Sequence, residues 1–98
     1  MKIEEWREEI DSIDEQILRL VNQRTRIALK IGGLKAKAGI PIYDKEREQD
    51  VLTRLCSSNA GPLESEAVAR IFRRIIHESR SVETHSIAHL QSQTKEIC

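Results

Sequence analysis

The sequence predicts an all-α protein of one domain, residues 1–98, and three observations support this prediction. Four glycines and two prolines divide the chain into three long tracts, whereas a sandwich or barrel of this length would need many more turns. Only 3% of the residues are aromatic, which is few for a large β-structure. Within each tract the apolar residues recur every three or four positions, as they do on one face of a helix.

The first helix is expected to run from about Ile3 to Ala38. Gly32 and Gly33 each weaken a helix by up to ~1 kcal/mol relative to alanine, but the strong helical pattern on both sides carries the helix through them. Pro41 ends the helical tract, because a proline disfavours a helical residue before it. A heptad-like apolar seam follows the helix and consists of Ile3, Trp6, Ile10, Ile13, Ile17, Leu20, Ile27, Ile31, Leu34 and Ala38.

The second and third helices are shorter than the first. The second is expected to open at Asp44, whose side chain can accept hydrogen bonds from the free N–H groups of the first turn, and to end in the loop of residues 57–59. The third is expected to begin near Ser65, after Gly61-Pro62. We therefore expect one very long N-terminal helix, a short second helix and a long third helix whose apolar stripe comprises Val68, Ile71, Phe72, Ile75, Ile76, Val82, Ile87 and Leu90.

The length of the first helix predicts a homodimer. A helix of about 36 residues rises ~54 Å, whereas a compact domain of about 100 residues is only about 30 to 35 Å across. Two further helices cannot cover an apolar seam of this length, and a large exposed apolar patch usually marks an interface. We expect an intertwined two-fold dimer with the long helices antiparallel, and an extended parallel coiled coil is the alternative.

The charge balance and the composition exclude several classes of function. Sixteen Lys and Arg residues balance sixteen Asp and Glu residues, which argues against nucleic acid or an anionic membrane as the partner. Since the chain has neither an apolar run near the ~18 residues of a membrane span nor a signal-peptide profile, we expect a cytoplasmic protein. Cys56 and Cys98 fit neither a metal site nor a disulfide framework. His85 and His89 lie one turn apart, and we expect a solvated helix face there rather than a metal site.

Cations occupy unexpected places on the first helix. Arg24 falls on the apolar seam between Leu20 and Ile27, and a buried arginine needs an anionic partner. Lys35 follows eleven residues later and lies within about 20° of the same face. Arg7 lies too far away on the same chain, but in an antiparallel dimer the partner's Arg7 falls between Arg24 and Lys35. For Arg24 alone, a register device or an arginine reaching out to solvent is the alternative.

The other two helices also carry polar residues on their apolar faces. Asp44, Arg47 and Glu48 share a stripe with aliphatic residues, although taken alone they fit an ordinary first turn. Ser79 and Glu83 interrupt the aliphatic stripe of the third helix. Together with the cations of the first helix, these residues predict a pocket for a small dianion, without an evident nucleophile–base pair.

Two motifs in the sequence resemble the all-helical class of chorismate mutases. They are R-x-x-I-D-x-I-D, which begins at Arg7, and G-I-P-I-x-D-x-x-R-E, which begins at Gly39. With Arg24 and Lys35 between them, the resemblance covers roughly residues 3–90. It implies a homodimer with two active sites and the rearrangement of chorismate to prephenate, towards phenylalanine and tyrosine, with no cofactor and no metal.

The resemblance also implies roles for the cations. The partner's Arg7 and Arg24 would bind the two carboxylates of the substrate. Lys35 would contact a carboxylate and the ether oxygen, and is expected to make the largest contribution to catalysis. Arg47 would help to position this cationic set.

The remaining site residues follow from the same resemblance. Asp44, chiefly through its backbone, and Glu48 would bind the ring hydroxyl, while Ser79 would support a carboxylate. Glu83 stands where many family members have glutamine as the second donor to the ether oxygen, and a carboxyl group can donate there only when it is protonated. Arg80 is a further cation beside the pocket stripe, where an apolar residue would be unremarkable; a position that faces solvent stays open, and no role is assigned to Arg80.

Two other functions fit the same residues. An isochorismate-pyruvate lyase would use the same dianion pocket to eliminate pyruvate from a related substrate, although the full cationic set with Arg47 and Glu48 favours the mutase. A non-enzymatic dimeric helical interaction module would instead tolerate substitution of Arg24, Lys35 and Glu48. We expect the chain to carry no fused dehydratase, dehydrogenase or synthase domain of the kind that some relatives contain.

Overall fold

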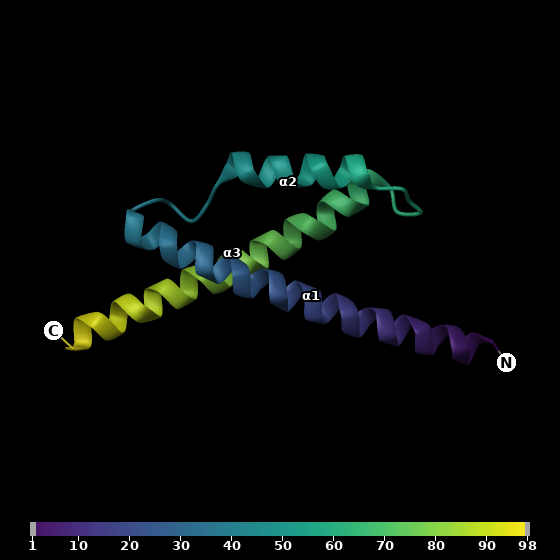
Figure 1. The fold of residues 1–98 in the computed structure, drawn as a ribbon, viewed down its shortest axis with the longest axis horizontal. Helices are drawn as coiled ribbons and strands as arrows, with labels where there is room; N and C mark the ends of the chain where they lie inside the picture. The colour runs from purple at the N-terminus through teal and green to yellow at the C-terminus, as the bar shows by residue number, and fades with distance from the viewer. Residues whose placement is uncertain (1, 98) are drawn as a thin grey trace.

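The computed structural model describes residues 2–97, with side chains described through residue 87, and this part of the chain forms three helices and no strand (Figure 1). The helices are α1 (Ile3–Ala38), α2 (Lys45–Ser58) and α3 (Ser65–Ile97). The all-α prediction and the expected helix ranges are confirmed. None of the helices in the described residues has a stretch that is long and apolar enough to cross a membrane. Cys98 and the side chains of His89 and Leu90 lie outside the described part.

Helix α1 ends in a left-handed turn at Gly39. The φ angle of Gly39 is 70°, a conformation that glycine adopts without steric cost. The turn brings the N–H of Ile40 within 2.8 Å of the carbonyl oxygen of Lys35, so that a carbonyl group of the last turn is satisfied. The helix therefore ends at Ala38, three residues before Pro41, and the proline prevents it from resuming.

The two ends of α2 are held by side chains. The Asp44 carboxylate accepts a hydrogen bond from the N–H of Arg47 at 2.9 Å, which confirms the predicted cap. In the loop that follows α2, the amide of Asn59 donates to the carbonyl oxygen of Leu63 at 2.7 Å and accepts from the N–H of Gly61 at 3.0 Å. These bonds fold the loop back, so that α3 returns alongside α2 (Figure 1).

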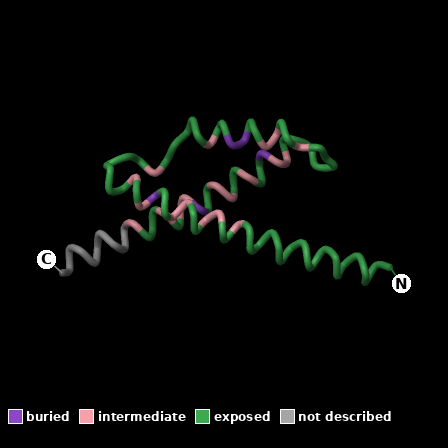
Figure 2. The backbone as a smooth tube through the Cα atoms, in the orientation of Figure 1, coloured by how far each residue is buried: buried purple, intermediate pink, exposed green. Residues whose placement is uncertain are grey.

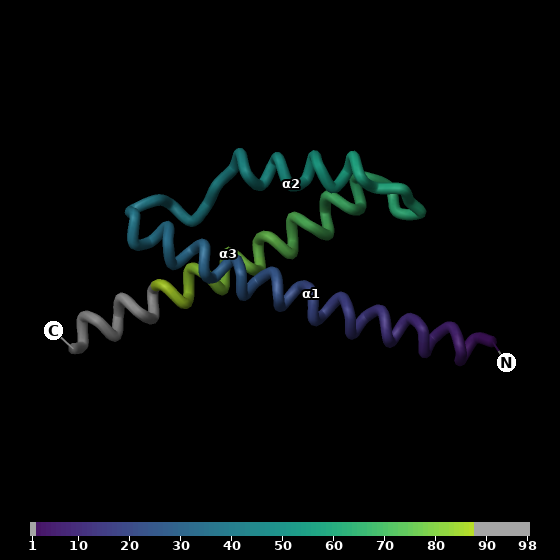
Figure 3. The backbone as a smooth tube through the Cα atoms, viewed as in Figure 1, coloured from purple at the N-terminus to yellow at the C-terminus, as the bar shows by residue number. Residues whose placement is uncertain are grey.

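Helix α3 joins the other two elements, because it packs against both α1 and α2. Thr25 meets Ser79 and Gly32 meets Glu83, so the C-terminal half of α1 crosses the middle of α3. The N-terminal half of α1 extends away from this crossing (Figure 3). The molecule measures 64 × 29 × 15 Å, with a radius of gyration of 17.6 Å, whereas a compact domain of about 100 residues has a radius near ~13 Å.

A single chain has a very small core. Among the described side chains, the buried apolar ones are Val51, Leu52 and Ala69, which lie where α2 meets α3 (Figure 2). Residues 2–20 of the chain are all exposed. Single-chain packing therefore leaves the predicted seam half or more exposed at Ile3, Trp6, Ile10, Ile13, Ile17, Leu20, Ile27, Ile31 and Leu34.

Candidate active site

A cleft of about 260 Å³ opens between the C-terminal half of α1, the start of α2 and the middle of α3. Its aliphatic wall comes from Ile27, Ala28, Ile31, Ile42, Val51 and Ile76. All of the predicted site residues except Arg7 also line it, namely Arg24, Lys35, Asp44, Arg47, Glu48, Ser79 and Glu83. Because three helices supply these residues, the cleft exists only when the helices have packed together.

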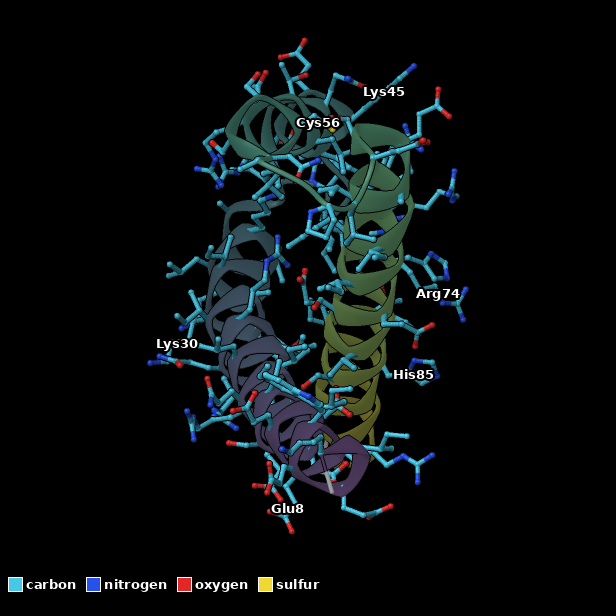
Figure 4. The ribbon with its side chains drawn as sticks, turned by 90° about the vertical axis from the view of Figure 1, so that its right-hand side faces the viewer. Glu8, Lys30, Lys45, Cys56, Arg74 and His85 are labelled. Carbon is cyan, nitrogen blue, oxygen red and sulfur yellow. The ribbon has the colours of Figure 1, made fainter. Side chains whose placement is uncertain are left out.

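Helix α1 supplies two cations to the cleft. Arg24 and Lys35 are half-buried and lie eleven residues apart, which places them on one face of the helix, as predicted. The Lys35 ammonium donates to the carbonyl oxygen of Ile42 at 3.3 Å. This contact ties the side chain to the segment before α2. Figure 4 shows Lys30, from the opposite side of the same helix, pointing away from α3.

The first turn of α2 supplies Asp44, Arg47 and Glu48. The Oδ1 atom of Asp44 caps the helix, and the backbone carbonyl oxygen of the same residue accepts from the N–H of Glu48 at 3.0 Å, so that both groups are held in the first turn. Glu48 is half-buried, and its side chain reaches across to α3.

Ser79 is the most buried polar residue among the described side chains, with 3% of its surface exposed. Its hydroxyl lies 2.8 Å from the hydroxyl of Thr25, which also donates to the carbonyl oxygen of Val21 at 3.0 Å. A hydroxyl has one hydrogen to donate. Two arrangements are therefore possible. When Thr25 donates to Val21, Ser79 donates to Thr25. When Thr25 instead donates to Ser79, the hydrogen of Ser79 is available for a bound carboxylate. The sequence reasoning missed Thr25, although it directly follows Arg24.

Glu83 packs against Gly32, where the two helices cross. A β-carbon at Gly32 would lie 3.1 Å from the Oε2 atom of Glu83, closer than nine in ten real contacts of a β-carbon, so a glycine here gives the carboxyl group its space. Burial raises the pKa of Glu83, while the nearby charges of Lys35, Arg80 and Arg24 oppose this shift. Gly32 thus has a structural role that the sequence pattern did not reveal.

Arg80, to which the sequence assigned no role, lies in the cleft. Its Nη1 atom donates to the Oε2 atom of Glu48 at 3.0 Å, and its guanidinium carbon lies 4.5 Å from the centre of the Tyr43 ring. The side chain lines the same cleft as Glu83. One signal in the sequence could have located it, since Arg80 precedes Glu83 by three residues and residues three apart share a helix face.

Arg7 does not reach the cleft of its own chain. Its side chain is 68% exposed and pairs with Glu4 of the same helix at 3.1 Å. This position agrees with the prediction that the cations of one chain cannot all share one small ligand. Within a single chain, the cleft therefore contains cations from all three helices, but it does not contain Arg7, which lies in the first turns of α1.

The charges that line the cleft are unequal. Four cationic side chains face three carboxyl groups, one of which is already paired with Arg80 and another of which caps α2. Protonation of Glu83 would increase the positive excess further. The cleft therefore suits a small ligand with more than one negative charge and an apolar body.

The histidines of the described part lie away from this charge cluster. The ring of His85 lies 2.9 Å from the carbonyl oxygen of Ser81 and faces outward in Figure 4. Among the described residues that line the cleft there is no cysteine or histidine. The lining supplies cations, carboxyl groups and the hydroxyl of Ser79, which is hydrogen-bonded to Thr25.

Comparisons with known proteins agree in sequence and in fold. A family model described as chorismate mutase type II matches residues 6–84. A bifunctional chorismate mutase/prephenate dehydratase of Aquifex aeolicus is 41% identical over 86 residues, which are 84% of this chain and 24% of that protein. The chain therefore spans about a quarter of the length of the bifunctional relatives that it matches.

A chorismate mutase of Methanocaldococcus jannaschii is similar over nearly its whole length, with 30% identity over 97 residues and 96% of each chain covered. The crystal structure of the chorismate mutase from Helicobacter pylori in complex with prephenate superposes with a TM-score of 0.81 and 31% identity. That superposition covers 88% of this chain and 93% of the other. The residues that line the cleft all lie within the segment matched by the family model.

Proposed function

Because the chain belongs to the chorismate mutase type II family, we propose that it catalyses the rearrangement of chorismate to prephenate. The reaction is unimolecular: the bond between the ring and the ether oxygen breaks while a carbon–carbon bond forms between the side chain and the ring. The observation that carries the proposal is the cleft, where cations from three helices surround an aliphatic wall. The Helicobacter pylori relative with the same fold was crystallised with prephenate.

The two carboxylates of chorismate would be bound by arginine and lysine side chains. Arg24 lies half-buried on α1, and its guanidinium can bind a carboxylate in a bidentate manner. The Lys35 ammonium donates a long hydrogen bond, 3.3 Å, to the Ile42 carbonyl oxygen, and an anionic ligand can take the place of this acceptor. Arg47 adds a third positive charge in the first turn of α2.

Lys35 and Glu83 are proposed to act on the ether oxygen. Negative charge grows on this oxygen as its bond to the ring breaks, and donors held in place beforehand stabilise that charge in the transition state. Lys35 supplies an ammonium group, and Glu83 supplies a hydrogen bond when it is protonated. The cleft would also hold the side chain of chorismate over the ring, which lowers the entropic part of the barrier.

The ring hydroxyl and one carboxylate would complete the set of contacts. Glu48 offers a carboxylate oxygen as an acceptor for the hydroxyl, and the backbone of Asp44 lies on the same side of the cleft. Ser79 would support a carboxylate in the arrangement in which Thr25 donates to it. These contacts fix the ring while the side chain reacts.

The active molecule is proposed to be a homodimer in which the partner's Arg7 completes each cleft. The N-terminal half of α1 exposes a row of large apolar side chains that a single chain leaves in water, and contiguous surfaces of this kind normally pack against a partner. An antiparallel copy of α1 would cover this row. It would also place the partner's Arg7 opposite the stretch between Arg24 and Lys35, two residues that line the cleft.

The proposed reaction can be tested directly by incubating the purified protein with chorismate and identifying the product. Prephenate is expected, with no cofactor added. Lys35→Ala should lower kcat/KM by at least about a hundredfold, because it removes the cation that faces the ether oxygen. Lys30→Ala, which removes an outward-facing lysine from the same helix, is the matched control and should leave the rate unchanged.

Circular dichroism and the oligomeric state of both variants show whether the fold is kept. If folded Lys35→Ala protein retains the parental rate, Lys35 does not have the proposed role. If chorismate is not consumed by the parent protein, or if pyruvate is released instead, the proposed reaction is wrong.

A further inference from the structure

Arg80 connects three parts of the cleft wall. Its side chain leaves α3, donates to Glu48 on α2 and lies over the ring of Tyr43 in the segment before α2. The two members of the ion pair are mostly buried, with 27% of the Arg80 side chain and 21% of the Glu48 side chain exposed. Ion pairs at this depth are screened less by solvent than surface pairs, so their geometry is better defined.

The ion pair uses only one of the two oxygens of Glu48. Arg80 binds Oε2 at 3.0 Å, and in the described part of the chain Oε1 has no hydrogen-bond partner. An ionised carboxylate can only accept hydrogen bonds. Glu48 therefore keeps one oxygen free for a donor in the cleft, such as a hydroxyl group of a ligand.

Without Arg80, the charge of Glu48 would have other cations to pair with. Arg47 is the neighbouring residue on α2, and Arg24 and Lys35 line the same cleft from α1. A glutamate paired with any of these would neutralise a charge that the substrate carboxylates need. Arg80 itself is held over the ring of Tyr43, since a guanidinium on an aromatic face is held in place. When Glu48 pairs with Arg80, the other cations therefore stay available for the substrate carboxylates.

We propose that Arg80 is a positioning residue for recognition of the ring hydroxyl: it holds Glu48 by one oxygen, so that the other oxygen is aimed at the hydroxyl of the substrate. This inference rests on the proposed function and assigns a specificity role within the same cleft. Arg80 itself does not touch the reacting atoms. The proposed role concerns the part of the substrate that carries the hydroxyl.

The test compares chorismate with its analogue that lacks the ring hydroxyl. The quantity measured is the ratio of kcat/KM for chorismate to kcat/KM for the analogue. Arg80→Met keeps the long apolar stem and removes the charge, and it should lower this ratio about tenfold, as expected for the loss of one well-oriented charge-assisted hydrogen bond. Any effect of Arg80 on catalysis at the ether oxygen acts on both substrates and cancels in the ratio.

A matched control breaks an ion pair elsewhere on the same helix. Arg74 pairs with Glu78 at 2.7 Å on the outer face of α3, so Arg74→Met should leave the ratio unchanged (Figure 4). Tyr43→Leu is the second variant, for the case that Arg80→Met does not fold. It leaves the ion pair in place but removes the aromatic face, and it should lower the ratio about two- to threefold.

The outcomes separate this inference from the proposed function. A lowered ratio for Arg80→Met with an unchanged ratio for Arg74→Met supports the inference. If the parent converts chorismate and the ratio is the same in parent, Arg80→Met and Tyr43→Leu, the positioning role is wrong while the proposed function stands. If the parent converts neither compound, the proposed function is wrong and this inference is wrong with it.

Discussion

Two opposing effects act on the pKa of Glu83. Burial against α1 raises its pKa, and this is the larger effect, while Lys35, Arg80 and Arg24 lower it. The protonated form therefore persists to higher pH than in an exposed glutamate, and a dianionic ligand bound nearby would extend this range. Because only the protonated form can donate to an ether oxygen, the role proposed for Glu83 depends on pH.

We predict that kcat/KM falls as pH rises through the titration of Glu83, by about tenfold per pH unit once the group is mostly ionised. Glu83→Gln should flatten this limb, because an amide donates at every pH. The measurement is the pH profile of kcat/KM for both proteins. Glu78→Gln, which alters an exposed carboxyl group of the same helix, should keep the parental profile. An unchanged limb in Glu83→Gln would mean that Glu83 is not the donor.

Single residues also show where sequence reasoning was incomplete. The seam and stripe patterns located Arg24, Lys35 and Ser79 on inward faces, since helical periodicity fixes the direction of a side chain around its own axis. The same periodicity did not reveal that Arg80 also faces inward, because its position at the edge of the stripe is compatible with solvent or cleft. The rotation of α3 against α2 decided between the two.

At the level of the helices, the cap of α2 holds the first turn that bears Arg47 and Glu48. Asp44 accepts from the N–H of Arg47 at 2.9 Å, and such caps are common because the first N–H groups of a helix have no partner within it. The start of α2 was predictable from the sequence because the interaction is local. It spans three residues and needs no tertiary contact.

We predict that Asp44→Ala lowers the free energy of unfolding by about 1 kcal/mol, the usual cost of losing a cap. Urea unfolding at equal protein concentration measures this loss, since the stability of an oligomer depends on concentration. Asp50→Ala, at an exposed position within the same helix, should change stability by less than about 0.5 kcal/mol. Equal losses in the two variants would contradict a capping role.

For the whole molecule, the main feature is the contrast between a 64 Å long protomer and its small core. The three buried apolar residues among the described side chains are far too few to hold a 36-residue helix in place by themselves. The proposed dimer resolves this contrast, because each α1 would be covered by the other. It also makes each cleft depend on two chains.

Mixing two inactive variants tests this dependence. Arg7→Ala and Lys35→Ala should each have low activity, because every site in either homodimer lacks one cation. After unfolding and refolding as an equal mixture, about half of the dimers are mixed, and each mixed dimer contains one intact site and one doubly altered site. Activity should therefore recover to about a quarter of the parental value. If the mixture is no more active than its components, Arg7 does not act across the interface.

The sequence by itself determined the helix boundaries, the apolar seam and three of the four cations that line the cleft. These features depend on hydrogen bonds and periodicities within a few residues, such as the turn at Gly39 and the cap at Asp44. The tertiary structure alone decided which side chains meet across helices: Arg80 with Glu48, and Gly32 with Glu83. Such pairs depend on how each helix is rotated and crossed against its neighbour, and helical periodicity leaves that rotation open.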